Sequence, residues 1–530
     1  MLVRLLLSSA AGLLLWTAFP PLSLWWTAPV AVAALVLVIR GMSARGGLLM
    51  GMAFGLGLYI PLLNWLGVVV GRDAGIGLTL FSALWMGLIG MLTAIGLRLR
   101  WWPMWVASVW VLGEALRSRI PFDGWTWGRL GFSQDTSILL PYAAYAGVAA
   151  LTFVVALTGS LLAWLVVRLT DRLGTRTEGA ADGGAQAPSG EAGGGPGLAS
   201  GAVATLVGVF VIAALVQPPT QGESGAGPST RQVGVIQGNV PQAGLDFNAE
   251  RTAVLNNHVQ QTLLLAEDVA SGRQAAPDLV LWPENASDID PYRDNQAYAA
   301  IEAAARAVNV PLLVGAVVND PNDDDQVFNQ GIVWDPITGP GESYTKRYLV
   351  PFGEYIPFRS ALASLISRFD RIPRDFVAGT HPGGLDIGGT RIGDAICFDV
   401  AYDRALREAV AEGARFLVVQ TNNATYNGTQ QPAQQLAMSR VRAVEHGRSV
   451  VVVSTSGLSA VVLPDGRIVP GTQTAELVAA RYVVEVAQRD TVTVSDRVGS
   501  IPEWVIAGLA LAAVCVSSVS RRRSRRSQSQ

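Results

Sequence analysis

Residues 391–400 read Arg391-Ile-Gly-Asp-Ala-Ile-Cys-Phe-Asp-Val400, an apolar run that ends at Cys397, one of only two cysteines in 530 residues. A short β-branched run of this kind predicts a buried strand. An isolated cysteine after such a strand is more often core packing than a nucleophile. The role of Cys397 therefore depends on which other side chains follow strands.

Two upstream motifs supply a carboxylate and an amine. Leu279-Val-Leu-Trp-Pro-Glu284 ends a second predicted strand, and Lys346-Arg-Tyr-Leu-Val-Pro-Phe-Gly-Glu354 lies on the connection after a third at 331–334. A doubly wound fold presents its functional groups at strand ends. Turn residues surround both motifs in otherwise apolar sequence. We therefore expect Glu284, Lys346 and Cys397 to share one catalytic site.

These three side chains suit acyl transfer. A cysteine attacks as a thiolate, so a nearby group must accept its proton. Histidine is the usual partner, but His258 falls in a predicted helix, His381 in a Gly/Pro loop and His446 at a helix end, where it would cap the dipole. We therefore expect Glu284 to act as the base and Lys346 to stabilise the oxyanion.

The region from about Thr230 to about Val498 has the α/β pattern of short β-branched runs between Ala-rich helical stretches. Strands are predicted at 232–237, 279–282, 311–315, 331–334, 391–396, 416–420, 449–453 and 460–463. Helices are predicted at about 247–270, 294–308, 402–412 and 432–446. Asn422 and Asn423 follow the strand at 416–420 and join the expected site.

The chain as a whole is too apolar for a soluble protein of this length. Half of the chain is hydrophobic, 15% is charged and the mean hydropathy is +0.34. Runs long enough to cross a bilayer lie near 3–19, 23–40, 47–70, 75–98, 102–117, 138–167, 200–217 and 501–519. We therefore predict a seven-helix membrane domain over 1–220 and an eighth span at 501–519.

Arginines near the span ends indicate the orientation of these spans. Alternate loops hold Arg40 and Arg45, then Arg98 and Arg100, then Arg168, Arg172 and Arg176, and finally the basic tail at 520–530. The opposite loops also hold Arg72, Arg117, Arg119 and Arg129, so the bias is clear without being absolute. We expect both termini in the cytoplasm and residues 230–498 outside. The Gly-rich stretch 174–198 is predicted to be a disordered cytoplasmic loop.

Other features exclude several function classes. The net charge of −2 and the lack of a basic stripe argue against nucleic acid binding. No P-loop, HExxH or paired Cys-x-x-Cys occurs, so no cofactor and no metal is expected. The Asp323–Asp325 run, with its Pro and Asn neighbours, favours a solvated turn. Cys515 lies in an apolar run, which makes a disulfide with Cys397 improbable.

Three motifs carry a family resemblance: Trp282-Pro-Glu284, Lys346-x-x-Leu-Val-Pro-Phe-Gly-Glu354 and Ile396-Cys397-Phe-Asp. They resemble the nitrilase, or carbon-nitrogen hydrolase, superfamily, whose sites use a Glu-Lys-Cys triad in an αββα sandwich. With the surrounding spans and the Gly-Trp-x-Trp loop at 124–127, the chain resembles the apolipoprotein N-acyltransferase family. That resemblance implies a multi-pass protein of the bacterial cytoplasmic membrane.

The resemblance also implies residue roles. Glu284 is then the base, Lys346 the oxyanion stabiliser and Cys397 the nucleophile. A phospholipid would donate its acyl chain to Cys397, and the α-amine of a diacylglyceryl-modified apolipoprotein would accept it in a ping-pong mechanism. Supporting roles fall to Glu354, Asp399, Asn422 and Tyr426. Candidate contacts to substrate are Trp125, Trp127 and Phe352.

The aromatic outer loop at 120–132 has two interpretations. We favour an interfacial aromatic belt over a wall that lines the active site. Apolar segments at 349–352 and 358–366 are candidate lids that keep water from a thioester.

This sequence departs from the family pattern in two places. Phe398-Asp399 stands where the family commonly has Tyr-Glu, and Thr425-Tyr426 where it has Trp-Phe. We expect activity with an altered donor or acceptor preference.

Two other functions compete with this prediction. One is a membrane-tethered amidase that uses the same triad, although an anchor would need only one span. The other is a catalytically silent lipoprotein-binding scaffold, against which the retained Glu284, Lys346 and Cys397 argue.

Overall fold

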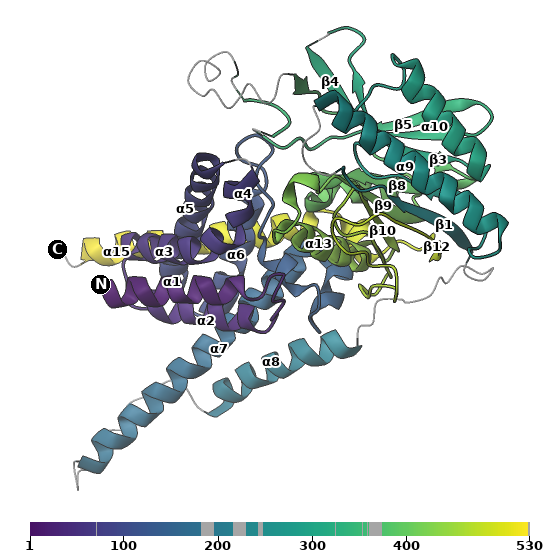
Figure 1. Cartoon of the computed structure of the whole chain (residues 1–530). Helices are drawn as coiled ribbons and strands as arrows, with labels where there is room; N and C mark the ends of the chain where they lie inside the picture. The colour runs from purple at the N-terminus through teal and green to yellow at the C-terminus, as the bar shows by residue number, and fades with distance from the viewer. Residues whose placement is uncertain are drawn as a thin grey trace.

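The computed structural model describes residues 1–530 apart from Val70, 182–195, 216–228, 242–246, Asp324, Phe352, Phe358, 360–373 and 528–530. Two parts lie side by side: a bundle of apolar helices and an α/β domain with two sheets (Figure 1). Of the predicted lid at 349–352 only Phe352 lies outside the described residues, whereas the lid at 358–366 lies outside them except for Arg359.

The helical part follows the predicted apolar runs closely. Its elements are α1 (Leu2–Trp16), α2 (Thr27–Ile39), α3 (Ala44–Leu62), α4 (Asn64–Val69), α5 (Arg72–Gly96), α6 (Trp102–Arg117), η1 (Leu130–Gln134), η2 (Leu140–Tyr142), α7 (Ala143–Ala181), α8 (Pro196–Leu215) and α15 (Ile501–Ser527). Residues 174–181 continue α7 and 196–198 begin α8, so these ends of the predicted disordered loop are helical. The middle of that loop lies outside the described residues.

Three helices in the described part of the chain are long and apolar enough to cross a membrane: Ala44–Leu62, Arg72–Gly96 and Leu140–Asp171. Leu2–Trp16, Thr27–Ile39, Ala204–Ala213 and Ile501–Ser517 are apolar but shorter. A membrane domain is therefore supported, whereas the predicted number of eight spans stays a prediction.

Small residues let α3 and α5 approach closely. A Cβ on Gly51 would lie 2.2 Å from the carbonyl oxygen of Met86, and one on Gly90 would lie 2.4 Å from that of Gly47. Real Cβ atoms do not reach such distances, so the helix crossing requires glycine there. Small residues serve helix contacts in apolar bundles in this way.

The α/β domain has two sheets that face each other. One has the strand order β12 (Ala480–Ala487), β1 (Thr230–Gln237), β2 (Leu279–Leu281), β3 (Leu312–Asn319), β4 (Gln326–Asp335), β5 (Gly339–Thr345), with β6 (Asp375–Phe376) on β4. The other has the order β11 (Ala460–Val462), β10 (Val450–Ser454), β9 (Phe416–Thr421), β8 (Thr390–Ile396), β7 (Gly384–Ile387).

Helices cover the outer face of each sheet, which gives the predicted αββα sandwich (Figure 1). Helices α9 (Phe247–Ala270) and α10 (Asn295–Val308) pack on the first sheet. Helices α12 (Asp403–Ala411) and α13 (Gln431–His446) pack on the second. Alternation along β2 shows the layering, because Leu279 and Leu281 point between the sheets whereas Val280 points toward the helices.

Some strands were not predicted. The β5 sequence Gly-Pro-Gly-Glu-Ser-Tyr-Thr carries turn residues and lacks the apolar alternation that marks a strand. We predicted Lys346 on a loop after the strand at 331–334. The structure instead has strand β5 between that strand and Lys346, which directly follows β5. Strand β12 was also missed, although its Tyr-Val-Val-Glu-Val core carries a β-branched signal, and β7 is short and Gly-rich at its start.

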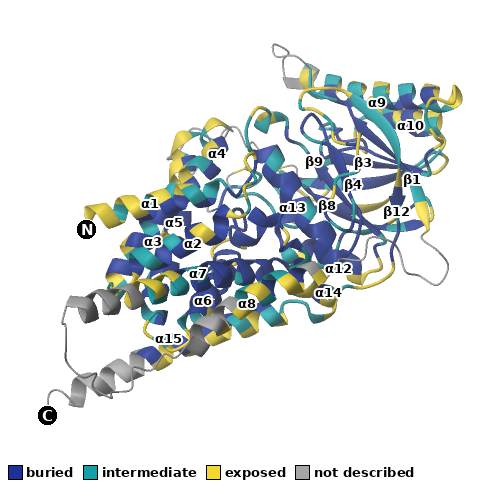
Figure 2. Ribbon diagram, turned by 90° about the horizontal axis from the view of Figure 1, so that it is seen from below, coloured by how far each residue is buried: buried dark blue, intermediate teal, exposed yellow. Residues whose placement is uncertain are grey.

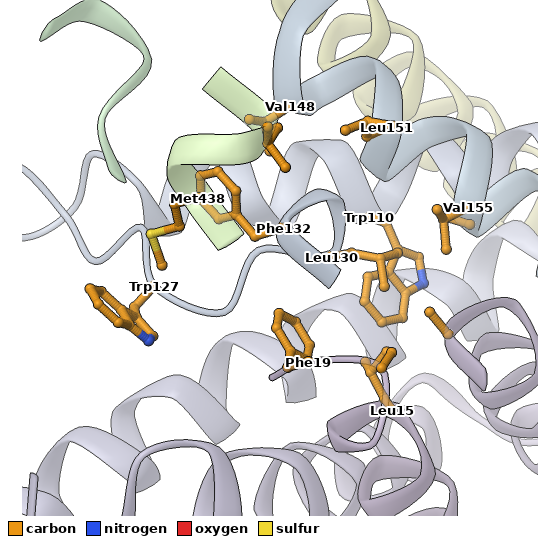
Figure 3. Close-up of a cluster of buried hydrophobic side chains, with 14 of the residues drawn as sticks. Leu15, Phe19, Trp110, Trp127, Leu130, Phe132, Val148, Leu151, Val155 and Met438 are labelled. Carbon is orange, nitrogen blue, oxygen red and sulfur yellow. The ribbon is translucent and has the colours of Figure 1, made fainter. Parts of the chain in front are cut away.

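Helix α13 joins the two parts of the molecule, since it lies between the second sheet and the helical bundle (Figure 2). Met438 of α13 belongs to the same buried apolar cluster as Trp127, Phe132 and Val148 (Figure 3). The core of the helical part therefore continues into the outer layer of the sandwich.

A buried charge network crosses the same junction. The Nη1 atom of Arg129, whose side chain is 2% exposed, lies 2.8 Å from Asp403 of α12. Other Arg129 nitrogens lie 3.7 Å from Glu114 of α6 and 3.9 Å from Glu503 of α15. Arg442 of α13 approaches Asp403 at 2.9 Å. Arg129 thus neutralises carboxylates from three elements that the chain brings together only on folding.

Replacing Arg129 by methionine should weaken this junction. The substitution leaves Asp403, Glu114 and Glu503 buried with one cation fewer, and breaking a buried ion pair costs about 3–5 kcal/mol. We expect the free energy of unfolding of Arg129→Met in detergent to fall by that amount. Arg273→Met is the control, because Arg273 is 62% exposed and its pair with Asp268 contributes at most about 1 kcal/mol. Equal losses in both variants would contradict the network's role.

Candidate active site

The predicted site residues meet where strands of the two sheets end. Glu284 lies just past β2 and Lys346 just past β5 in the first sheet. Cys397 directly follows β8 and Asn422 directly follows β9 in the second. Because the sheets face each other, these four strand ends converge on one region between the sheets.

A tight backbone approach fixes the position of Glu284. A Cβ on Gly315 of the neighbouring strand β3 would lie 2.1 Å from the carbonyl oxygen of Pro283 and 2.8 Å from the Cα of Glu284. Only glycine fits there. The Glu284 carbonyl accepts a hydrogen bond of 3.0 Å from the Thr455 hydroxyl, which joins it to the second sheet.

The Glu284 carboxylate accepts hydrogen bonds on both oxygens. Oε1 accepts from Asn329 Nδ2 at 2.7 Å and from Lys346 Nζ at 3.2 Å. Oε2 accepts from the backbone N–H of Asn422 at 2.7 Å. These donors come from β4, from the end of β5 and from the end of β9. The carboxylate is 5% exposed and held in one orientation.

Lys346 lies between two carboxylates. Its Nζ donates to Glu354 Oε1 at 2.8 Å as well as to Glu284, and it is 1% exposed. Burial opposes the ammonium charge, but Glu284 and Glu354 outweigh it and raise the pKa of Lys346 well above its ordinary value. Lys346 is therefore a fixed cation at neutral pH.

The other oxygen of Glu354 holds the loop after Lys346, because it accepts from the Val350 N–H at 2.8 Å. Asn329 was not predicted as a site residue. It is 1% exposed, and its amide reaches both Glu284 and, at 3.4 Å, Glu354. No local pattern marks it, because β4 also carries Gln326 and Gln330 and the carboxylates that Asn329 contacts lie on other segments.

Cys397 occupies a strained turn. Its φ is 50°, a left-handed conformation uncommon for a residue with a side chain. The turn exposes part of Cys397 beyond the sheet. Burial of the sulfur and the Glu284 carboxylate raise the pKa of the thiol to about 12, although Lys346 and a hydrogen bond with Thr421 oppose the shift. The resting side chain is therefore a neutral thiol.

Asp399 joins the segment before Cys397 to the segment that follows Lys346. Its Oδ2 accepts from the Ile396 N–H at 3.0 Å and from the Tyr344 hydroxyl at 2.7 Å. Its Oδ1 accepts from the Tyr348 N–H at 2.9 Å. Burial raises the pKa of Asp399 to about 6, against the opposing effects of Lys346 and these donors. Tyr344, which sequence analysis did not single out, supplies the contact from β5.

Aromatic rings connect this site to the helical part. Phe398, next to Cys397, lies with its centroid 5.5 Å from Trp125 and 6.2 Å from Trp127. The ring centroid of Trp65, on α4, lies 5.3 Å from that of Trp127 and 5.4 Å from that of Tyr426. Trp125 and Trp127 are 7% and 3% exposed, so they pack at the junction and do not form the interfacial belt that we favoured. Phe352 lies outside the described residues.

Gln434 of α13 orients the indoles of Trp127 and Trp65. Gln434 Oε1 accepts from Trp127 Nε1 at 2.7 Å and from Trp65 Nε1 at 3.3 Å, while its Nε2 donates to the Leu62 carbonyl at 3.2 Å. Nothing in the sequence pattern marked Trp65 or Gln434, because their partners lie hundreds of residues away.

The histidines do not serve this site. His258 is buried against Trp282, and burial lowers its pKa to about 4. His446 Nδ1 lies 2.6 Å from Asp496, so its partner is a carboxylate and not only the helix end. In the part of the chain that the structure describes, no group of three His, Cys, Asp or Glu side chains is arranged to hold a metal ion.

Comparisons with known proteins agree with this two-part organisation. The family described as apolipoprotein N-acyltransferase N-terminal domain matches residues 11–161, and the family described as carbon-nitrogen hydrolase matches 232–489. An apolipoprotein N-acyltransferase of Mycolicibacterium smegmatis is 40% identical over 87% of this chain and 76% of its own length. One from Pseudomonas syringae pv. tomato is 30% identical over 87% of each chain.

Two solved structures resemble about half of this chain. An amidase from Nesterenkonia sp. is 19% identical, covers 48% of this chain and 90% of its own, and has a TM-score of 0.34. Saccharomyces cerevisiae Nit3, of the nitrilase superfamily, is 17% identical, covers 52% of this chain and 94% of its own, and has a TM-score of 0.36.

The raised pKa of Cys397 predicts its reactivity. In a Cys515→Ser background, only Cys397 is left to be alkylated by iodoacetamide. The rate should rise about tenfold for each pH unit from 7 to 9 and should not level off, because the thiolate fraction grows until the pH reaches the pKa. Mass spectrometry of the labelled peptide measures this rate. A plateau below pH 9 would mean that Lys346 instead stabilises a resting thiolate.

Proposed function

Because this chain belongs to the apolipoprotein N-acyltransferase family, we propose that it moves an acyl chain from a phospholipid, through a thioester on Cys397, to an apolipoprotein. The acceptor is the α-amine of the S-diacylglyceryl-cysteine at the apolipoprotein N-terminus. The observation that carries the proposal is the convergence of Glu284, Lys346 and Cys397 at strand ends of two facing sheets.

In the first half-reaction Glu284 takes the proton of Cys397 as the sulfur attacks the ester carbonyl carbon. The tetrahedral oxyanion lies beside the Lys346 ammonium, which stabilises the developing charge. The bond from carbon to the glycerol oxygen then breaks, and Glu284 returns its proton to that oxygen. A lysophospholipid leaves, and the acyl chain stays on Cys397 as a thioester.

In the second half-reaction the neutral α-amine attacks the thioester carbonyl. Glu284 accepts the amine proton, the carbon–sulfur bond breaks, and the thiolate recovers a proton from Glu284. The product is an amide, and the enzyme returns to its resting protonation. Since burial and Glu284 raise the pKa of the resting thiol to about 12, little thiolate is present beforehand, and we propose that proton transfer to Glu284 accompanies the attack.

The location of the site suits lipid substrates. Each CH₂ group withdrawn from the bilayer into water costs about 0.8 kcal/mol, so an acyl donor is best met at a membrane. Trp125 and Trp127 lie against Phe398 at the junction with the helical part. We assign these indoles to the wall along which the acyl chain reaches Cys397 and which keeps water from the thioester.

We also propose how the chain crosses the membrane. Eight spans divide the chain into a membrane domain at 1–220, an extracytoplasmic catalytic domain at 230–498, a last span at 501–519 and a cytoplasmic tail at 520–530. Two observations support it: the arginine distribution, and the location of the N-terminal end of α1 and the C-terminal end of α15 on the side of the bundle away from the sheets (Figure 1).

Intact-mass analysis after incubation with a phospholipid tests the covalent step. We expect the mass of one acyl chain to be added, to be removed by hydroxylamine, and to be absent in Cys397→Ala. Cys515→Ser is the matched control and should keep the adduct. If an apolipoprotein is N-acylated although no adduct forms, the thioester is wrong. If neither reaction occurs and a small amide is hydrolysed, the chain is an amidase.

Asp399 should give the acyl-transfer rate a pH dependence. Its carboxylate form accepts three hydrogen bonds, and with a pKa of about 6 the group gains a proton as the pH falls through that value. The wild-type rate should therefore drop about tenfold per pH unit below about 6.

Two variants separate this effect from other titrations. Asp399→Asn should be slower at pH 7.5 and lose the drop between pH 7 and 5. Asp288→Asn is the control, because burial also raises the pKa of Asp288 to about 6; it should keep the drop. If Asp288→Asn abolishes the drop instead, Asp399 is not its source.

A further inference from the structure

Two arginines converge on one carboxylate beside the active site. Arg404 donates to Glu408 Oε1 from Nη2 at 2.7 Å and from Nε at 3.0 Å. Arg347 donates from Nη1 to the other oxygen, Glu408 Oε2. The cluster therefore holds two positive charges and one negative charge. Arg347 is the most buried member of the cluster and Arg404 the most exposed: the side chains of Arg347, Glu408 and Arg404 are 14%, 29% and 70% exposed.

The cluster adjoins the catalytic lysine. Arg347 is the residue after Lys346, so their Cα atoms are about 3.8 Å apart. The next residue, Tyr348, donates its backbone N–H to Asp399, which also holds the segment before Cys397. Asp399 thus holds the backbone next to Arg347 in a fixed position relative to Cys397.

An aromatic path joins the cluster to Cys397. The Arg347 guanidinium carbon is 5.8 Å from the ring centroid of Tyr348. Tyr348 stacks on Tyr402 at 4.0 Å, and Tyr402 meets Phe398 edge-on at 5.2 Å. Phe398 is the residue after Cys397. Apolar ring faces therefore lead from the nucleophile to a cationic site.

The cluster also lies at the junction with the helical part. The Tyr402 hydroxyl donates to the Gly124 carbonyl at 3.0 Å, and Asp403, next to Arg404, pairs with Arg129. Both Gly124 and Arg129 belong to the outer loop. Arg404, the most exposed member of the cluster, therefore lies on the chain beside two residues that contact this loop.

This arrangement matches the chemistry of a glycerophospholipid, in which only the glycerol backbone separates the ester carbonyl from an anionic phosphodiester. Planar guanidinium groups bind phosphate through paired hydrogen bonds, which a lysine would not reproduce. Glu408 occupies the two guanidinium groups when no phosphate is bound, and its carboxylate would have to give up part of these contacts.

We infer that Arg347 and Arg404 form the phosphate-binding subsite for the phospholipid donor, with Glu408 competing for the same guanidinium groups. This inference rests on the proposed acyl transfer and names how its donor is recognised. It commits to the lipid phosphodiester as ligand, in preference to a free phosphate ion.

The test uses the full-length protein in detergent with two acyl donors. One is a phospholipid, and the other is a fatty-acid 4-nitrophenyl ester, which has no phosphate. Arg404→Gln and Arg347→Gln should each raise KM for the phospholipid, and the double variant should raise it by about tenfold. Acylation of Cys397 by the nitrophenyl ester should not change.

Glu408→Gln gives an effect of opposite sign. It frees both arginines, so KM for the phospholipid should fall several-fold, whereas a purely structural cluster would be damaged by every one of these substitutions. Arg306→Gln is the matched control, because Arg306 forms a similar 2.8 Å pair with Glu302 on α10 and is 62% exposed. Arg306→Gln should change KM neither for the phospholipid nor for the nitrophenyl ester.

The remaining outcomes separate the alternatives. If Arg404→Gln and Arg347→Gln leave the phospholipid KM unchanged, or if Glu408→Gln raises it, the subsite is wrong while acyl transfer stands. If inorganic phosphate, but not chloride at equal ionic strength, inhibits the wild type and the variants alter only that inhibition, the site binds free anions and the inference is overturned. If no donor acylates Cys397 in the wild type, the proposed function itself fails.

Discussion

One ammonium shared by two carboxylates determines the chemistry of this site. Lys346 contacts Glu284 at 3.2 Å and Glu354 at 2.8 Å in a region closed to water. Burying these charges is costly unless each is paired and hydrogen-bonded, and Asn329 with the N–H groups of Asn422 and Val350 completes the set. The net negative charge that remains is one reason why the adjacent thiol stays neutral until substrate arrives.

The same constraint explains why the two sheets must close on each other. Glu284 and Lys346 belong to one sheet, whereas Cys397 and the N–H of Asn422 belong to the other. Asp399 and Thr455 add hydrogen bonds between the sheets. Helix α13 then carries the arrangement into the helical part, because one helix is both the outer layer of the sandwich and the docking surface for the bundle.

Sequence patterns identified the parts of this protein whose signal is local. Period and composition located the apolar helices and most strands. Strand ends marked Glu284 and Cys397, and a turn-rich motif marked Lys346; the structure brings these three residues together. The patterns did not identify β5, whose glycines and proline resemble a turn, or Asn329 and Tyr344, whose importance comes from partners on other strands. The buried location of Trp125 and Trp127 was likewise not recognisable, since an aromatic loop beside membrane spans has the same composition whether it faces lipid or protein. The catalytic roles themselves stay predictions.

The neutral state of Cys397 has a consequence for its chemical lifetime. Peroxides and disulfides react with the thiolate, and a thiol with a pKa of about 12 is ionised in only about one molecule in 10⁵ at pH 7. In the extracytoplasmic location that we propose for residues 230–498, oxidants act without cytoplasmic reductants. By remaining protonated, the Cys397 thiol is protected from the oxidation that destroys cysteines of lower pKa.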